Sequence, residues 1–499
     1  MKNWGIIFAI CLCLTACHST VLSDRLDLGD DAALEQFPWA DVKPIEENLL
    51  PDARPILAEM ESAPYYMLDF ELDPMLKSVK GTVVVRYTNT SKDELPYLVF
   101  QLFPVIYGGT VSLGEVTVND QTVMTELADE GRIVHVVLAQ PLHAGESIVV
   151  SVPFESSIPR EMGGNYGLYG YFDEILVLDG FYPLLAIYDQ GEWHTNISSP
   201  NGDIKYEEMS LYSVTAELPV GLKVITTGQI TTETKNSKTQ ILTFAAGPVR
   251  EFYLAASEGF VSKERIWDGV NLRSTGVEGS EEAIDFALDV SEEAVKSYSS
   301  RFGLYPYTEL DVISTPMQAL GMEYPGVSTI ATGLYDLSST SQGTPNQVML
   351  DIVIAHEIGH QWFFNLVGND QVEEPWLDEA LTQYIVRLYY EDTYGDSAAQ
   401  SYADSWKARW SRVNFAETPI GLPSYEYDPQ SYGSIVYGRG PLFVEALETS
   451  MGEQVFAKAM KTYFETYKWQ IATGKEFKQS METSCGCNLT SIFDQWVNE

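Results

Sequence analysis

The stretch His356-Glu357-Ile358-Gly359-His360 is the strongest indication of fold and function in this sequence. On a helix, residues four apart share one face, so both imidazoles can reach one metal ion while Glu357 stands beside its water. An apolar run over residues 348 to 354 leads into the motif and favours a helix there. The pattern is typical of a zinc-dependent hydrolase.

A catalytic zinc ion usually takes three protein ligands and keeps a fourth position for water. The candidate third ligand is Glu379, which follows His360 after the eighteen residues 361 to 378. It lies in a segment that reads as a second helix, opened by Pro375 and closed by Gly395. Two helices joined by a turn can bring Glu379 against both histidines. The sequence therefore predicts one zinc ion per chain, bound by His356, His360 and Glu379.

These segments resemble the gluzincin metallopeptidases of the M1 aminopeptidase family. Upstream, Gly321-Met322-Glu323 resembles the Met-Glu part of the family's exopeptidase motif, Gly-Ala-Met-Glu-Asn. By that match Glu323 holds the free amino group of a peptide, and Gly321 and Met322 line the substrate cleft. Downstream, Tyr437-Gly438-Arg439-Gly440 resembles the family's Tyr-Glu-Lys-Gly segment, whose tyrosine donates to the oxyanion.

The sequence departs from these motifs in several places. Leu320 and Gly321 replace Gly-Ala, Tyr324 replaces the asparagine, and Arg439 stands where lysine is usual. Arginine keeps the positive charge but not the hydrogen-bond geometry of lysine. The substrate end of the cleft is therefore expected to differ from the family pattern.

The expected chemistry is hydrolysis of amino-terminal residues from peptides. Glu357 is expected to act as general base, and Tyr437 as oxyanion stabiliser. Asp179, in a Leu-Asp-Gly segment, is a second candidate for amino-group binding, although Asp-Gly is also a common turn. Two alternatives remain: a zinc endopeptidase of the same fold, and a non-catalytic peptide-binding surface lipoprotein.

The amino-terminal segment predicts export. An apolar run from Trp4 to Leu14, too short to span a bilayer, ends in Leu-Thr-Ala-Cys at Cys17. This resembles a bacterial lipoprotein signal, which implies cleavage before Cys17 and lipidation of that residue; a plain secretory signal is the alternative. Residues 1–17 are then the signal peptide and residues 18–55 a tether. The chain is expected to be anchored to a bacterial membrane.

The composition excludes some partners. The chain has 71 acidic and 30 basic residues, a formal charge of −41, which disfavours nucleic acid as an electrostatic partner. Peptides are the expected substrates, and the sequence does not indicate an oligomeric state. Cys485 and Cys487 either form a disulfide or remain thiols.

The pattern of strands and helices predicts a multidomain α+β fold. Short alternating runs dominate residues 56–275, which predicts an all-β amino-terminal domain, saddle-like by the M1 resemblance. Residues 276–499 turn helical and are expected to form a thermolysin-like, mainly helical zinc catalytic domain. Compared with large M1 enzymes, the chain is expected to lack the long helical carboxy-terminal domain.

Overall fold

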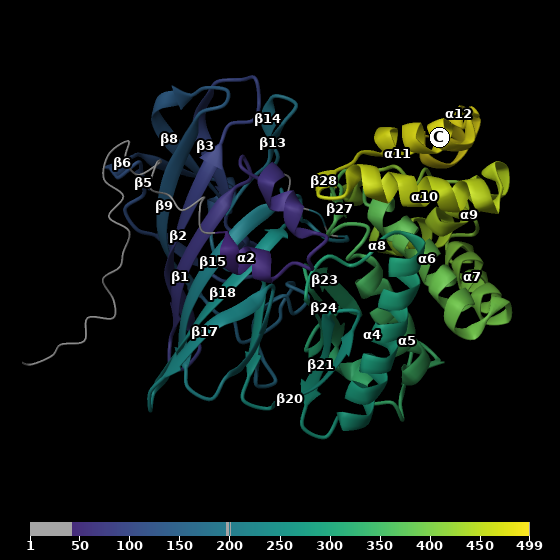
Figure 1. Cartoon of the computed structure of the whole chain (residues 1–499), viewed down its shortest axis with the longest axis horizontal. Coiled ribbons are helices and arrows are strands. Elements are labelled where there is room, and N and C mark those ends of the chain that lie inside the picture. The colour runs from purple at the N-terminus through teal and green to yellow at the C-terminus, as the bar shows by residue number, and fades with distance from the viewer. Residues whose placement is uncertain (1–41, 196–198, 200, 499) are drawn as a thin grey trace, which may run out of the picture.

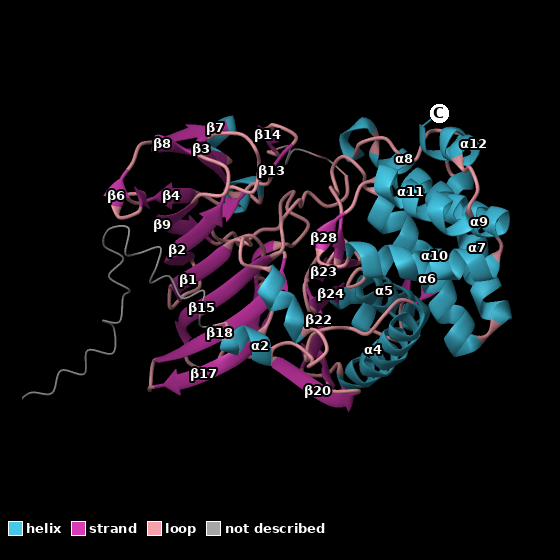
Figure 2. Cartoon of the chain, turned by 45° about the horizontal axis from the view of Figure 1, so that its top comes forward, coloured by secondary structure: helices cyan, strands magenta, loops and turns pink. Residues whose placement is uncertain are grey.

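The computed structural model describes residues 42–195, 199 and 201–498. A β-rich amino-terminal half lies beside a mainly helical carboxy-terminal half (Figure 1). The division by secondary structure is clear in Figure 2, where strands fill one side and helices the other. The expected α+β fold class, an all-β domain followed by a helical catalytic domain, is confirmed.

The amino-terminal half is built on a large twisted sheet in the order β17-β18-β15-β1-β2-β9-β5-β6, with β4 also paired to β9. Its strands alternate buried and exposed residues, as β2 does with Val79, Val83 and Val85 facing inward. The bounds are β1 Tyr65–Leu72, β2 Ser78–Thr88, β4 Val111–Leu113, β5 Thr117–Val118, β6 Gln121–Thr122, β9 Ser147–Ser157, β15 Ser210–Pro219, β17 Gln229–Lys235 and β18 Thr239–Val249.

Two four-stranded sheets complete this half, in the orders β10-β11-β19-β16 and β12-β3-β8-β7. Every residue of β11 is buried, and the chain continues from it directly into Asp179. The bounds are β3 Leu95–Gln101, β7 Thr125–Ala128, β8 Ile133–Leu142, β10 Tyr169–Phe172, β11 Ile175–Leu178, β12 Leu184–Leu185, β16 Lys223–Thr226 and β19 Leu254–Ser257; a small hairpin joins β13 Tyr188–Asp189 to β14 Glu192–Trp193.

The carboxy-terminal half, which is the expected catalytic domain, opens with a five-stranded sheet in the order β20-β21-β22-β24-β23. Its strands are β20 Phe260–Trp267, β21 Val270–Val277, β22 Glu309–Thr315, β23 Gly321–Tyr324 and β24 Val327–Ala331. The expected boundary between residues 275 and 276 cuts through this sheet, so the structure moves the boundary to before Phe260. A β-hairpin shows the same alternation of apolar and polar residues whichever sheet it joins. The sequence pattern alone therefore placed the boundary within the hairpin of β20 and β21 instead of before it.

The helices α4 and α5 pack against that sheet, and further helices form the rest of the catalytic half. The predicted helices after Pro375 and around residues 348 to 360 are both present, as α6 and α5. The bounds are α4 Glu281–Arg301, α5 Asn346–Gly359, α6 Trp376–Tyr394, α7 Asp396–Ser411, α8 Pro429–Ser434, α9 Gly440–Met451, α10 Glu453–Tyr467, α11 Gly474–Cys485 and α12 Thr490–Phe493, with a π-helix, η5, over Ile435–Arg439. Two short parallel strands, β27 Val367–Gly368 and β28 Gln470–Ile471, join the loop after α5 to the segment between α10 and α11.

Part of the expected tether belongs to the folded body. Residues Lys43–Glu47 form the helix α2, and Leu49 is fully buried and bridged to Tyr307 of the catalytic half. Of the predicted range 18–55, residues 42–55 are therefore packed rather than extended. The predicted signal peptide, Cys17 and the tether up to residue 41 lie outside the described residues. None of the described helices combines the length and the hydrophobicity that a membrane span requires.

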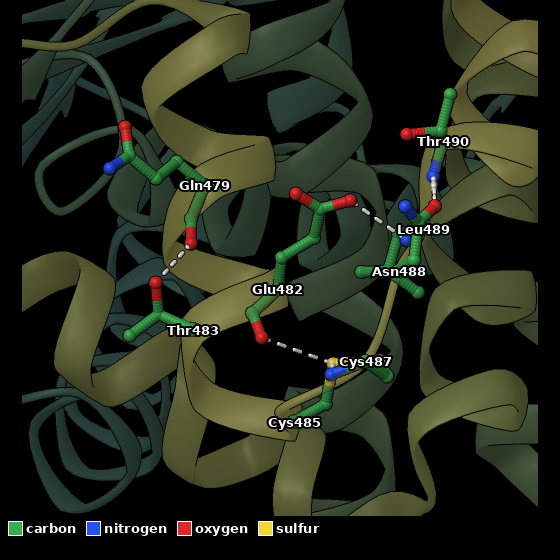
Figure 3. Close-up of a disulfide and its surroundings, with 8 residues drawn as sticks. All are labelled: Gln479, Glu482, Thr483, Cys485, Cys487, Asn488, Leu489 and Thr490. Carbon is green, nitrogen blue, oxygen red and sulfur yellow. Dashed lines mark hydrogen bonds between the residues drawn. A yellow bond between two sulfur atoms is a disulfide. The ribbon is translucent and has the colours of Figure 1, made fainter.

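The two carboxy-terminal cysteines form a disulfide between Cys485 and Cys487, which settles the alternative that the sequence left open (Figure 3). Gly486 between them has a φ of 62°, a left-handed conformation that glycine adopts without steric cost and that ends α11. The backbone N–H of Leu489 donates to Glu482 at 2.8 Å. The disulfide thus forms part of the turn that leads from α11 to α12.

Candidate metal centre and active site

Three side chains converge where the end of α5 meets the start of α6. The Nε2 atoms of His356 and His360 lie 3.1 Å apart, and Oε2 of Glu379 lies 3.1 Å from the first and 3.6 Å from the second. Ligands of a tetrahedral zinc ion, bound at roughly 2.0–2.1 Å, lie about 3.3 Å apart. The predicted donor set is confirmed as a cluster, and its size and chemistry fit zinc.

Close packing of the two helices makes this convergence possible. A Cβ atom at Gly359 would lie 2.9 Å from Cγ2 of Thr382 and 3.0 Å from Cδ1 of Ile385, closer than real contacts allow. The glycine between Glu357 and His360 therefore lets α6 approach α5 until Glu379 reaches the imidazoles. The same approach puts the Thr382 hydroxyl 3.2 Å from Nδ1 of His360.

Both imidazoles are buried, and the Nδ1 atom of each contacts a neighbouring polar group. Nδ1 of His360 lies 3.1 Å from the carbonyl oxygen of Phe363, so as a donor it leaves Nε2 free for a metal ion. The side-chain amide of Gln383 lies 3.3 Å from Nδ1 of His356, and Tyr402 and Arg409 donate to Oε1 of the same glutamine. Burial, together with the neighbouring imidazole, lowers the pKa of His356 to about 4, which favours the neutral form that metals bind.

Glu357 faces the edge strand β23. A Cβ atom at Gly321 would overlap its carboxylate, so only glycine leaves space for this side chain. Burial, and then the nearby carboxylate of Glu323, raise the pKa of Glu357 well above its usual range. Gly321 was predicted to line the substrate cleft. Its position beside Glu357 leaves no space for a side chain larger than that of glycine.

Tyr437 reaches the centre from the π-helix η5. Its hydroxyl donates to Oε1 of Glu379, while Oε2 of the same carboxylate faces the histidines. π-Helical turns are rare and occur frequently at functional sites. Arg439, two residues on, donates to the backbone carbonyls of Thr418, Gln495 and Trp496, and so holds the end of the chain against η5. Arg439 therefore links η5 to two other backbone segments through these hydrogen bonds.

Met322 and Glu323 line a cavity of about 90 Å³ between the two halves of the molecule. The Glu323 carboxylate accepts from Nε2 of Gln371 at 2.8 Å, and its backbone carbonyl accepts from Nδ2 of Asn365 at 2.9 Å. Nε2 of Gln371 also donates to Asp378, the neighbour of Glu379, at 3.0 Å. These contacts fix Glu323 relative to the metal ligands.

The far wall of the same cavity comes from the β-rich half. Asp179 lies there, as the sequence suggested, but it is paired with Lys205 at 2.7 Å and accepts from the hydroxyl of Tyr107 at 2.9 Å. Asp203 also lines the cavity, and burial followed by the charge of Glu323 raises its pKa well above the usual range. Asp203 and Lys205 sit in a loop, and no sequence motif marks them or Gln371.

Residues 286–496 match the family model described as the peptidase family M1 domain. A probable aminopeptidase 2 of Sulfurisphaera tokodaii is 27% identical over 299 residues, 58% of this chain and 38% of its own length. Aminopeptidase 2 of Candida albicans is 26% identical over 269 residues, 51% of this chain and 29% of its own length. The chain thus spans between about three tenths and two fifths of the length of these curated relatives.

Solved structures share the fold. A crystal structure of an M1 zinc metallopeptidase from Deinococcus radiodurans matches with a TM-score of 0.65 and 19% identity, over 87% of this chain and 94% of that one. A two-domain M1 zinc metallopeptidase with bound L-arginine matches with a TM-score of 0.66 and 18% identity, over 87% of this chain and 94% of its own. Residues 286–496 are therefore similar to the peptidase family M1 domain, and the chain shares the two-domain α+β fold of these M1 zinc metallopeptidase structures.

Proposed function

We propose that the protein is a zinc-dependent aminopeptidase that removes amino-terminal residues from peptides. The observation that carries the proposal is the packing of β23 against α5. The strand that bears Glu323 contacts the carboxylate of Glu357, which follows the candidate metal ligand His356 directly in the sequence. A group that can bind an amino terminus therefore lies beside a group that can activate water. Relatives named as aminopeptidases support the same activity.

His356, His360 and Glu379 would hold the zinc ion. When bound, zinc supplies a Lewis acid that polarises the scissile carbonyl and makes water acidic enough to attack near neutral pH. Glu357 takes the proton of the attacking water and then passes it to the departing nitrogen, acting first as general base and then as general acid. Its burial and its contact with β23 keep the carboxylate at one place throughout.

Tyr437 stabilises the oxyanion. Its hydroxyl already lies at the metal centre, where it donates to Glu379, and a small shift brings it to a substrate oxygen in the same space. Such a donor counts most in the transition state, because negative charge develops on that oxygen only during the reaction. Tyr437 should therefore affect turnover more than substrate binding.

Glu323 restricts the reaction to the amino-terminal bond. A carboxylate fixed near the metal ligands pairs with the ammonium group of a peptide and so sets the distance to the first carbonyl carbon. Gln371 and Asn365 hold Glu323 in place, and Asp203 adds a second carboxylate beside it. A peptide without a free amino group would leave these buried carboxylates without an opposite charge, which costs free energy.

Replacing Glu357 by glutamine tests the proposal. The variant keeps the shape of the side chain but cannot take a proton, so hydrolysis of aminoacyl amides should fall by several orders of magnitude. Glu282→Gln, on the exposed start of α4, is the matched control and should be unaffected. Unchanged hydrolysis by Glu357→Gln would reject the mechanism.

The substrate itself decides between exopeptidase and endopeptidase action. The wild-type protein should cleave a peptide with a free amino terminus and leave its acetylated counterpart intact. Cleavage of the acetylated peptide at internal bonds would show an endopeptidase. Binding of peptides without any zinc-dependent cleavage would show a peptide-binding module.

We also propose that the protein is exported and held at a bacterial membrane by a lipid on Cys17, on the strength of the amino-terminal sequence. A Cys17→Ser variant should lose the lipid and leave the membrane fraction. Equal membrane association of the variant and the wild type would contradict the anchor.

A further inference from the structure

The cavity beside the metal centre is unusually acidic for a buried space. Among the described residues, four carboxylates line it, those of Asp179, Asp203, Glu251 and Glu323, against the single ammonium group of Lys205. Burying a charge is costly unless an opposite charge pairs with it. The α-ammonium group of a peptide can balance Glu323 and Asp203 at the end near the metal ligands. The other end keeps an excess of carboxylates.

Lys205 alone does not neutralise the carboxylates at the end of the cavity away from the metal ligands. Its Nζ lies 2.7 Å from Asp179 and 2.8 Å from Glu251, and a third carboxylate, that of Glu207, lies 3.6 Å away. One ammonium group is therefore shared among three carboxylates. Burial is also the main reason that the pKa of Glu251 is raised well above its usual range. A second cation at this end would favour the ionised form of these carboxylates and pair with it.

Two unpaired polar atoms on the cavity wall independently indicate a ligand. The hydroxyl of Tyr324 is buried with no hydrogen-bond partner among the described residues, although its ring stacks on Tyr253 at 3.8 Å. Oε1 of Gln371 is likewise buried and unpaired, since its amide nitrogen serves Glu323 and Asp378. Buried polar atoms without partners are rare in proteins, and both atoms can accept hydrogen bonds. A ligand rich in donors would satisfy them.

We propose that the cavity binds a basic side chain, so that the enzyme prefers peptides beginning with arginine or lysine. The inference rests on the proposed aminopeptidase function and names its substrate class. The α-ammonium group binds near Glu323, and the cation at the end of the side chain binds near Asp179, Glu251 and Tyr324. Met322 and Leu168 on the wall suit the methylene groups between the two charges.

Arginine and citrulline provide a sharp test, because they have nearly the same shape and differ in charge. The wild-type protein should cleave arginyl amides with a kcat/KM roughly 10- to 100-fold above citrullinyl amides, the range typical of a hydrogen bond to a charged group. Lysyl amides should likewise exceed norleucyl amides. Equal rates for arginyl and citrullinyl amides, or a preference for leucyl amides over both basic ones, would overturn the proposal.

Variants locate the effect in the cavity. Asp179→Asn should lower the ratio of arginyl to citrullinyl kcat/KM by about tenfold, while Asp173→Asn should leave it unchanged. Asp173 is a matched control because it is exposed in the turn between β10 and β11, on the same sheet. If Asp179→Asn does not fold, Glu251→Gln should lower the same ratio. A folded variant of either kind with the wild-type ratio would overturn the assignment.

A binding measurement separates this inference from the proposed function. Free arginine should raise the melting temperature of the zinc-loaded wild-type protein at concentrations where citrulline does not. If no aminoacyl amide is cleaved but arginine still stabilises the protein selectively, the catalytic proposal fails and the cavity assignment stands. If amides are cleaved and arginine binds no better than citrulline, the cavity assignment fails alone.

Discussion

Tyr437→Phe removes one hydroxyl from the metal centre and keeps the ring that packs 6.2 Å from the His356 imidazole. The hydroxyl now donates to Oε1 of Glu379, on the side of the carboxylate away from the histidines. Loss of one oxyanion donor typically costs about 3 kcal/mol, or roughly 100-fold in kcat. We therefore expect kcat to fall about 100-fold while KM changes by less than about threefold.

The assay is steady-state hydrolysis of an aminoacyl amide, with zinc content measured on the same samples. Tyr467→Phe, which removes a hydroxyl from a half-buried residue at the end of α10, serves as the control and should retain full activity. The zinc measurement matters because the hydroxyl also orients a metal ligand. Unchanged kcat would refute the reasoning, and so would a loss of activity that excess zinc fully restores, since Tyr437 would then act only through Glu379.

Three further predictions concern space, metal and pH. Gly321→Ala should reduce kcat at least tenfold, because its Cβ atom overlaps the Glu357 carboxylate, whereas Gly333→Ala, with nothing within 4 Å, should be neutral in the same assay. Removal of zinc by a chelator should abolish hydrolysis and lower the melting temperature, and added zinc should restore both; activity that persists in chelator would argue against a metal enzyme. Burial, and then Asp311, raise the pKa of Glu309 from 4.5 to about 8. The native state then holds a proton that the unfolded chain has released, so this residue makes the free energy of unfolding decrease as pH rises from about 4.5 to about 8. Glu309→Gln should flatten that part of the pH–stability curve measured by denaturant unfolding, and an unaltered slope would contradict the assignment.

Much of the metal centre could be predicted from the sequence because its parts are local. The spacing of His356 and His360 on one helix face follows from helix geometry, and Pro375 and Gly395 bound the helix that carries Glu379. Tyr437 and Glu323 were found through motifs of the M1 resemblance, and the structure places Tyr437 on Glu379 and Glu323 on the strand that touches Glu357. The π-helical turn that carries Tyr437 has no sequence signature of this kind.

The domain boundary and the cavity wall could not be predicted in the same way. The strands β20 and β21 alternate like those of the β-rich half, and only their pairing with β22 assigns them to the catalytic half. Residues 42–55 are polar and contain prolines, yet the burial of Leu49 makes them part of the folded body. Patterns report which face of a segment is apolar, but not the partner that covers it.

The sequence by itself thus predicted the candidate metal ligands, the proposed general base and the two-part α+β fold, because each follows from the period of a single element or from a short motif. Only the tertiary structure decided the chemistry of the substrate cavity. Asp203 and Lys205 meet Glu323 and Gln371 across the two halves of the molecule, more than a hundred residues apart in the chain. Such a meeting depends on how whole domains pack, which no local pattern records, and the proposed substrate preference rests on it.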